Sequence, residues 1–225
     1  SCFNHTIFDM QVLTHELGHA FAGYMAMRSQ PISDYYSEST DIAEIHSMSM
    51  EQFAYPYAEW FFGDQADKFR FAHLQEALTF VPFGVAVDEF QHICYAHPEL
   101  TPKERTYQWH LLEEKYMPWR KYENDAFMER GGYWYHKLHI YLYPFYYINY
   151  TLTTMGAMEF KKKYAEDKAT AWQNYLKLCK TGGSYLETLR YAELSNPFED
   201  GSVARACGYA EEILLKQIAQ QEKNA

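Results

Sequence analysis

Over residues 14–20 the chain reads Thr-His-Glu-Leu-Gly-His-Ala, with two histidines four residues apart. On a helix, residues four apart share one face, and their Cβ atoms lie about 5–6 Å from each other. His15 and His19 can therefore present two imidazoles to one ion. Apolar residues at helical spacing surround the motif and predict a buried helix. These residues are Val12, Leu13, Leu17, Ala20 and Phe21.

The acidic residue of this motif has its own chemical meaning. Glu16 directly follows His15, so its carboxylate is expected beside a bound ion rather than on it. Zinc held by three protein ligands keeps one position open for water. A carboxylate beside that water can take its proton and pass it to a leaving amine. The pattern is typical of a zinc peptidase, although so short a motif also occurs by chance on helices with two ordinary histidines.

A third ligand is expected on a later segment, where residues 40–51 read as a second helix. Asp41 falls in its first turn, where a negative charge is favourable, and Ile42 and Ile45 indicate a largely buried helix rather than a solvated acidic face. Glu44 as ligand, with Asp41 holding a histidine by its other ring nitrogen, would give a metal both direct and supporting contacts. The candidates for the third ligand are Asp34, Glu38, Asp41, Glu44, His46 and Glu51.

Together, these segments resemble the thimet oligopeptidase / oligoendopeptidase F family of zinc peptidases, and the oligoendopeptidase F branch most closely. Residues 41–51 read Asp-Ile-Ala-Glu-Ile-His-Ser-Met-Ser-Met-Glu, and Glu44 stands twenty-five positions after His19. In that family the glutamate ligand is followed seven residues later by another glutamate, a spacing that Glu51 keeps. The resemblance implies zinc ligands at His15, His19 and Glu44, a general base at Glu16, and a supporting residue at Glu51, in addition to the supporting role expected of Asp41.

A second block, residues 131–150, resembles the family's downstream histidine and tyrosine cluster, which helps bind substrate and transition state. Pro144 suits the first turn of a helix, which would then carry the tyrosines that follow. A phenol donor aimed at the developing oxyanion would stabilise the transition state, although a tyrosine-rich helix is also typical of core packing. The spacing leaves the assignment among the tyrosines open. The candidates are His139, Tyr146 and Tyr150, with Tyr147 next.

Composition restricts the class of protein. The 225 residues are 48% hydrophobic and 22% charged, which is normal for a globular protein, and strand patterns are nearly absent. A net charge of −10 disfavours nucleic-acid binding, and no apolar run is long enough to span a membrane. Scattered cysteines without metal-binding spacing indicate free thiols in a reducing compartment, the cytoplasm, although an oxidising compartment remains open. They are Cys2, Cys94, Cys179 and Cys207.

The organisation of the chain follows from local signals. Pro82 and Gly84 are expected to kink or divide a helical pattern over residues 66–96, and Thr101 with Pro102 marks a clear helix start. No linker or repeat divides the chain, so residues 1–225 are expected to form a single helical catalytic region. The resemblance implies that this is the C-terminal part of a larger peptidase, whose preceding region packs on it.

The sequence therefore predicts an all-α, zincin-like region with a histidine-bearing helix and a glutamate-bearing helix. The resemblance implies an endopeptidase that hydrolyses short peptides with one zinc ion per chain. Two alternatives remain. One is a zinc metallocarboxypeptidase of another helical family. The other is a catalytically incomplete fragment or scaffold that binds zinc without turnover.

Overall fold

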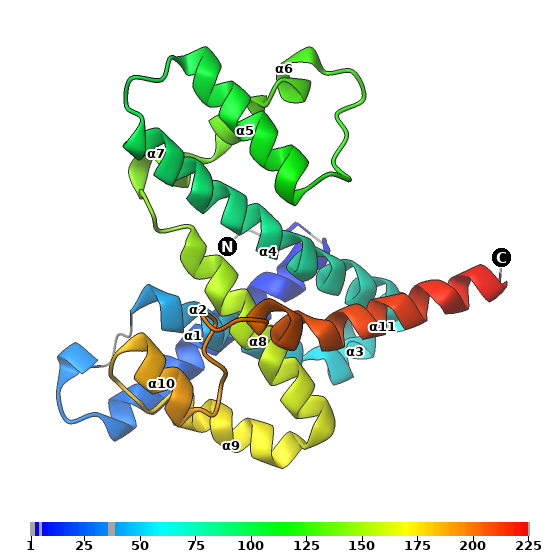
Figure 1. The fold of residues 1–225 in the computed structure, drawn as a ribbon. Coiled ribbons are helices and arrows are strands. Elements are labelled where there is room, and N and C mark those ends of the chain that lie inside the picture. Colours follow the sequence, from blue (N-terminus) through cyan, green and yellow to red (C-terminus); the bar gives the residue numbers. More distant parts are fainter. Residues whose placement is uncertain (1–2, 5, 36–38, 225) are drawn as a thin grey trace. The chain divides into compact units, whose positions relative to one another are not determined.

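The computed structural model describes all residues except 1–2, 5, 36–38 and 225 (Figure 1). The described residues form helices and no strand, which confirms the predicted all-α class. The α-helices are α1 Ile7–Ser29, α2 Thr40–Phe53, α3 Glu59–Phe62, α4 Ala66–Ala96, α5 Pro102–Tyr116, α6 Ala126–Glu129, α7 Leu138–Leu142, α8 Ile148–Glu166, α9 Lys168–Leu178, α10 Tyr185–Tyr191 and α11 Ser202–Asn224. Short 3₁₀ helices are η1 Ser33–Tyr35, η2 Tyr55–Tyr57, η3 Gly63–Gln65 and η4 Gly132–His136.

The chain separates into two compact units. The first unit comprises Ser1–Leu78 and Leu152–Ala225, and the second comprises Thr79–Thr151. The boundaries fall inside α4 and α8, so neither boundary coincides with a loop. None of the described helices combines the length and the apolar character that crossing a membrane requires.

The packing of α1 against α2 sets the geometry of the first unit. A Cβ atom added to Gly18 would lie 2.6 Å from Ser47 Cα and 2.7 Å from the His46 carbonyl oxygen, so the two backbones nearly touch there. Small residues at a spacing of four suit such an approach. The buried residues of α1 are Met10, Thr14, Gly18, Ala22 and Ala26.

The predicted burial is therefore wrong for Leu13 and Leu17, whereas Phe21 is partly buried and packs against the core of the first unit. Leu13 is 49% exposed and Leu17 is 54% exposed. Hydrophobicity alone pointed to these side chains, but the narrow space between α1 and α2 accepts glycine and alanine instead. Small size is therefore required where α1 meets α2 at Gly18, whereas the large side chains of Phe21 and Met25 pack against the core.

The core of the first unit surrounds α2. Ile42 and Ile45 are completely or almost completely buried, and they pack in one cluster with Phe160 of α8 and Tyr175 of α9. A Cβ atom on Gly156 would lie 3.2 Å from Ile45 Cδ1, so α8 also approaches α2 closely. Helix α2 is thus held between α1 and the C-terminal helices, which fixes the direction of its acidic side chains.

The second unit has a separate aromatic core, in which Phe90 of α4 and Trp109 of α5 are fully buried. Pro82 and Gly84 were expected to kink or divide this helix; the division does not occur, because α4 is continuous over Ala66–Ala96. Gly84 serves packing instead of breaking the helix, since a Cβ atom there would lie 1.9 Å from Thr151 Oγ1.

The predicted helix start at Thr101 and Pro102 is confirmed by the capping of α5. Thr101 Oγ1 accepts a hydrogen bond from the Glu104 backbone N–H at 3.3 Å, and the Glu104 carboxylate accepts one from the Thr101 N–H at 2.8 Å. Pro102 occupies the start of this helix, where a missing N–H costs nothing.

The start of α8 differs from the prediction. The helix begins at Ile148, not at Pro144, which lies in a turn. Phe145 has a φ of 62°, which no α-helix accommodates, and its N–H donates to Gln91 Oε1 at 2.8 Å. A tertiary hydrogen bond to a buried glutamine therefore overrides the local preference of Pro144 for a helical first turn.

We expect a matched pair of glycine substitutions to report the close approach of α1 and α2. Gly18→Ala should lower the free energy of unfolding by about 1–3 kcal/mol, because α2 must move to admit the new methyl group. Gly23→Ala, on the same helix with no atom within 4 Å of its added Cβ, should be neutral or stabilising by up to about 1 kcal/mol. Urea titrations followed by circular dichroism measure both. Equal effects would contradict the tight packing at Gly18.

Candidate metal centre

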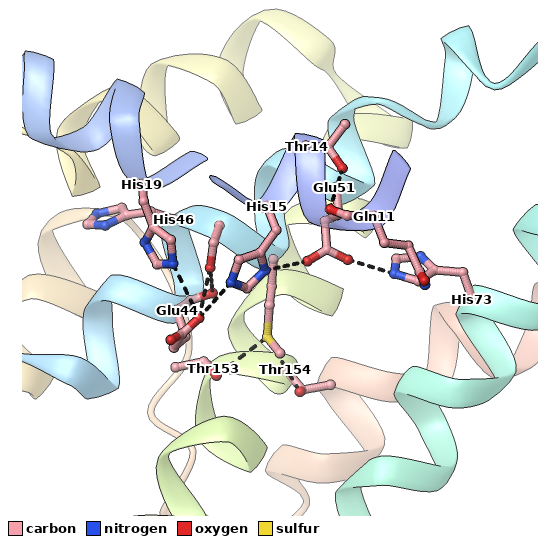
Figure 2. A network of polar contacts seen from close by, with 12 residues as sticks. Gln11, Thr14, His15, His19, Glu44, His46, Glu51, His73, Thr153 and Thr154 are labelled. Atoms are coloured by element: carbon pink, nitrogen blue, oxygen red, sulfur yellow. Dashed lines mark hydrogen bonds and ion pairs between the residues drawn. The ribbon is translucent and has the colours of Figure 1, made fainter. Parts of the chain in front are cut away.

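Helices α1 and α2 bring two histidines and one glutamate together. Glu44 Oε2 lies 3.1 Å from His15 Nε2 and 3.6 Å from His19 Nε2 (Figure 2). The potential ligand atoms of all three residues lie within 4.8 Å of one another. Among the described residues, this is the one group of histidine, cysteine or acidic side chains with such a geometry.

The arrangement fits a zinc ion. Tetrahedral zinc with bonds of about 2.0–2.1 Å separates its ligand atoms by about 3.3 Å, close to both Glu44 distances. The His15 and His19 rings are 4.9 Å apart between centroids and nearly perpendicular, so they do not stack on each other. Two imidazoles and one carboxylate are the donor set of a catalytic zinc site with an open position.

Electrostatics at this centre also favour a cation. Burial lowers the pKa of His15, but hydrogen bonds to Glu44 and Glu51 outweigh burial and raise it to about 9. Burial raises the pKa of Glu44, yet its hydrogen bonds to His15 and His19 hold it well below the usual range. Burial also raises the pKa of Glu51, but its hydrogen bonds to His15 and His73 lower it below the usual value. Both glutamates are therefore carboxylates near neutral pH, and their negative charges converge on His15.

The supporting contact to the histidine comes from Glu51. Glu51 Oε1 lies 2.7 Å from His15 Nδ1, the ring nitrogen that faces away from Glu44. Asp41, predicted to make such a contact, has a buried Oδ1 without a hydrogen-bond partner among the described residues. Position 51 lies three turns along α2 from Asp41, and only the crossing of α1 over α2 decides which acid reaches the ring.

The other candidates for the third ligand do not join the group. His46 is 3% exposed and packs edge-on against the Tyr175 ring, and burial lowers its pKa to about 4. Asp34 lies exposed in η1, and Glu38 falls outside the described residues. Of the five candidates that the structure describes, only Glu44 reaches both His15 and His19 as a possible ligand.

Glu16 is exposed on α1, directly beside His15 in the sequence. Its carboxylate makes no hydrogen bond or ion pair within the described part of the chain. It is therefore free to contact water or substrate. A carboxylate in this position has the chemistry of a general base.

The predicted histidine and tyrosine cluster forms within the second unit. The His139 ring centroid lies 6.2 Å from that of Tyr146, 5.1 Å from Tyr147 and 5.9 Å from Tyr150. Tyr146 and Tyr147 belong to the turn before α8, and Tyr150 belongs to α8 itself. The four rings gather although the helix expected to carry them starts later.

Burial gives this cluster donor character. Tyr147 is 6% exposed, and burial raises the pKa of its phenol to about 12, so the hydroxyl stays protonated. Burial and the nearby Lys137 lower the pKa of His139, which favours the neutral imidazole. These side chains can therefore donate hydrogen bonds without adding charge.

One polar residue near the metal centre was missed by the sequence analysis. His73 of α4 places Nε2 at 2.7 Å from Glu51 Oε2, and it is 7% exposed. It stands twenty-two residues beyond Glu51 and belongs to no motif, so no local pattern could have identified it.

Comparisons with known proteins agree on one family. The family model described as peptidase family M3 matches residues 4–205. An oligoendopeptidase F homolog of Borreliella burgdorferi is 29% identical over 184 residues, which cover 80% of this chain and 30% of that protein. The chain thus spans less than a third of the length of this curated relative.

Solved structures are similar in sequence and in fold. A crystal structure provisionally assigned as oligoendopeptidase F is 48% identical with a TM-score of 0.88, and covers 94% of this chain and 38% of its own. PZ peptidase A, solved with an inhibitor, is 45% identical with a TM-score of 0.88. The match covers 95% of this chain and 38% of PZ peptidase A. A Bacillus anthracis structure with the same provisional assignment is 40% identical with a TM-score of 0.79. The match covers 95% of this chain and 35% of the Bacillus anthracis chain. The chain belongs to peptidase family M3, in its oligoendopeptidase F branch, as its motifs predicted.

Proposed function

We propose that this chain is the catalytic region of a zinc-dependent endopeptidase that hydrolyses short peptides. The observation that carries the proposal is the convergence of His15 Nε2, His19 Nε2 and Glu44 Oε2 at spacings that suit one zinc ion. Glu16 supplies a free carboxylate on the same helix as the two histidines. Membership of peptidase family M3 supports peptide-bond hydrolysis as the reaction.

The reaction divides between the metal and the side chains. Bound zinc would polarise the scissile carbonyl and make the attacking water more acidic. Glu16 takes a proton from that water and later delivers it to the leaving amine. Glu51 holds His15 through Nδ1, which keeps Nε2 free for the ion.

His139 and its neighbouring tyrosines are proposed to bind the substrate backbone and the developing oxyanion. The pKa directions of Tyr147 and His139 support hydrogen-bond donation from neutral groups. Donors that already point at the oxyanion stabilise the transition state without reorganisation. Tyr146 and Tyr150 are the other candidates in this role, since both rings flank His139.

The cellular compartment is part of the proposal. Cys94 and Cys207 are free thiols, whereas Cys2 lies outside the described residues. Unpaired cysteines support a reducing compartment, and we propose the cytoplasm.

Zinc content provides the first test. The purified chain should hold about one zinc ion, and His15→Ala should lose it because two protein ligands bind zinc far more weakly than three. His92→Ala is the control, since His92 is an exposed histidine in the second unit. Elemental analysis after dialysis measures all three proteins. Equal zinc in His15→Ala and the wild type would contradict the ligand assignment.

Glu16→Gln should separate metal binding from catalysis. The amide cannot accept the proton of the attacking water, so kcat should fall by about 10²-fold or more while zinc content is unchanged. Glu211→Gln, an exposed change on α11, should leave both quantities at the wild-type value. Turnover of Glu16→Gln at a rate close to that of the wild type would remove Glu16 from its proposed role.

Peptides blocked at both ends distinguish the alternative activities. An endopeptidase should cleave an acetylated and amidated fluorogenic peptide at an internal bond, because it does not need a free terminus. A metallocarboxypeptidase should release single residues only from peptides with a free carboxylate. A zinc-binding scaffold should hold the ion and cleave neither substrate. Mass spectrometry of the products identifies which of these outcomes occurs.

A further inference from the structure

The hydrogen bonds at the candidate metal centre continue into the interior of the first unit. Glu51 Oε1 lies 2.7 Å from His15 Nδ1, and Glu51 Oε2 lies 2.7 Å from His73 Nε2 (Figure 2). Beyond it, His73 Nδ1 lies 2.7 Å from the Tyr55 hydroxyl. A continuous chain of hydrogen bonds therefore joins Tyr55 of η2 to His15 of α1.

The inner members of this chain are shielded from water. His73 is 7% exposed and Tyr55 is 8% exposed. A buried donor or acceptor that loses its partner bears the full cost of its desolvation. Each member therefore depends on the next, and the geometry of one end is coupled to that of the other.

The available donors give the chain one direction. The ionised Glu51 carboxylate only accepts hydrogen bonds, so His73 donates to it through Nε2–H. A neutral His73 then has its lone pair on Nδ1, which accepts a hydrogen bond from the Tyr55 O–H. Since an ionised carboxylate only accepts, the remaining Glu51 oxygen receives the Nδ1–H of His15. The neutral form of His15, which metal ligation requires, then has its lone pair on Nε2.

Packing holds the inner rings in place. The His73 ring stacks on Phe69 at 5.6 Å between centroids with an angle of 9°. The Lys161 Nζ atom lies over the Tyr55 ring, 3.4 Å from its centroid. Because helices α4 and α8 supply these neighbours, His73 and Tyr55 are fixed independently of α1.

We propose that His73 and Tyr55 are positioning residues for the metal centre, which hold His15 through Glu51 in the orientation and tautomer that present Nε2 to zinc. This inference rests on the proposed function, because it requires that the centre binds zinc. Within the described part of the chain, neither residue hydrogen-bonds to the three candidate ligands. Their effect therefore passes through Glu51.

Two substitutions of His73 separate positioning from simple packing. In His73→Gln the side-chain nitrogen falls near the position of Nε2, so it can still donate to Glu51. In His73→Asn the shorter side chain falls near Nδ1 and cannot reach Glu51. Tyr55→Phe keeps the ring and removes only the hydroxyl that meets His73.

Zinc affinity of the metal-free protein, measured by competition with a chromophoric chelator, provides the test. His73→Asn should weaken zinc binding by about 10–100-fold, the range expected when a residue that supports a ligand is lost. His73→Gln should recover most of that loss, and Tyr55→Phe should show a smaller loss than His73→Asn. The cobalt-substituted proteins should show altered d–d spectra in the same order.

A control separates these effects from general destabilisation. Tyr122→Phe removes a phenol–carboxylate hydrogen bond to Glu113 in the second unit, and should leave zinc affinity unchanged even if the protein unfolds more easily. Unfolding midpoints of the metal-free proteins are measured alongside. If His73→Asn does not fold, the zinc affinities of Tyr55→Phe and His73→Gln are compared with that of the wild type instead.

The outcomes are distinct. Wild-type zinc affinity and an unchanged cobalt spectrum in His73→Asn and Tyr55→Phe would overturn the positioning role and leave the zinc centre intact. A wild-type chain that binds no zinc would overturn the proposed function, and this inference with it. Loss of affinity in His73→Asn with recovery in His73→Gln would support the positioning role.

Discussion

The contact between the backbones of α1 and α2 at Gly18 is the constraint on which the candidate metal centre depends. Gly18 lies between His15 and His19, and it meets α2 at Ser47, one turn after Glu44. A glutamate side chain is short, so Glu44 reaches both imidazoles only where the helices nearly touch. The glycine of the motif is therefore as necessary to the geometry as its histidines.

Two negatively charged carboxylates surround His15 and make the site suitable for a cation. Glu44 and Glu51 approach His15 from opposite ring nitrogens, and burial makes each unpaired charge costly. A dication bound at Nε2 would balance the carboxylates while leaving Nδ1 bonded to Glu51. The same glutamate also binds His73, so a single side chain connects the candidate ligands to the interior of the first unit.

The candidate metal ligands and the histidine and tyrosine cluster were predictable from the sequence to different degrees. A spacing of four on one helix identified His15 and His19, and a family spacing pointed to Glu44 and Glu51. The tyrosines were also identified, but not the backbone that carries them. A positive φ at Phe145 and its hydrogen bond to Gln91 replace the expected first turn with a tight bend, which nevertheless gathers the rings around His139.

The sequence by itself determined the all-α class, the histidine pair, the second helix with its glutamates and the capped start of α5, because each depends on residues within a few turns of one another. Tertiary structure alone decided which face of α1 is buried, that Glu51 and not Asp41 reaches His15, and that His73 joins the network. These features arise where distant segments meet, and the space and partners available there are not encoded in any local pattern.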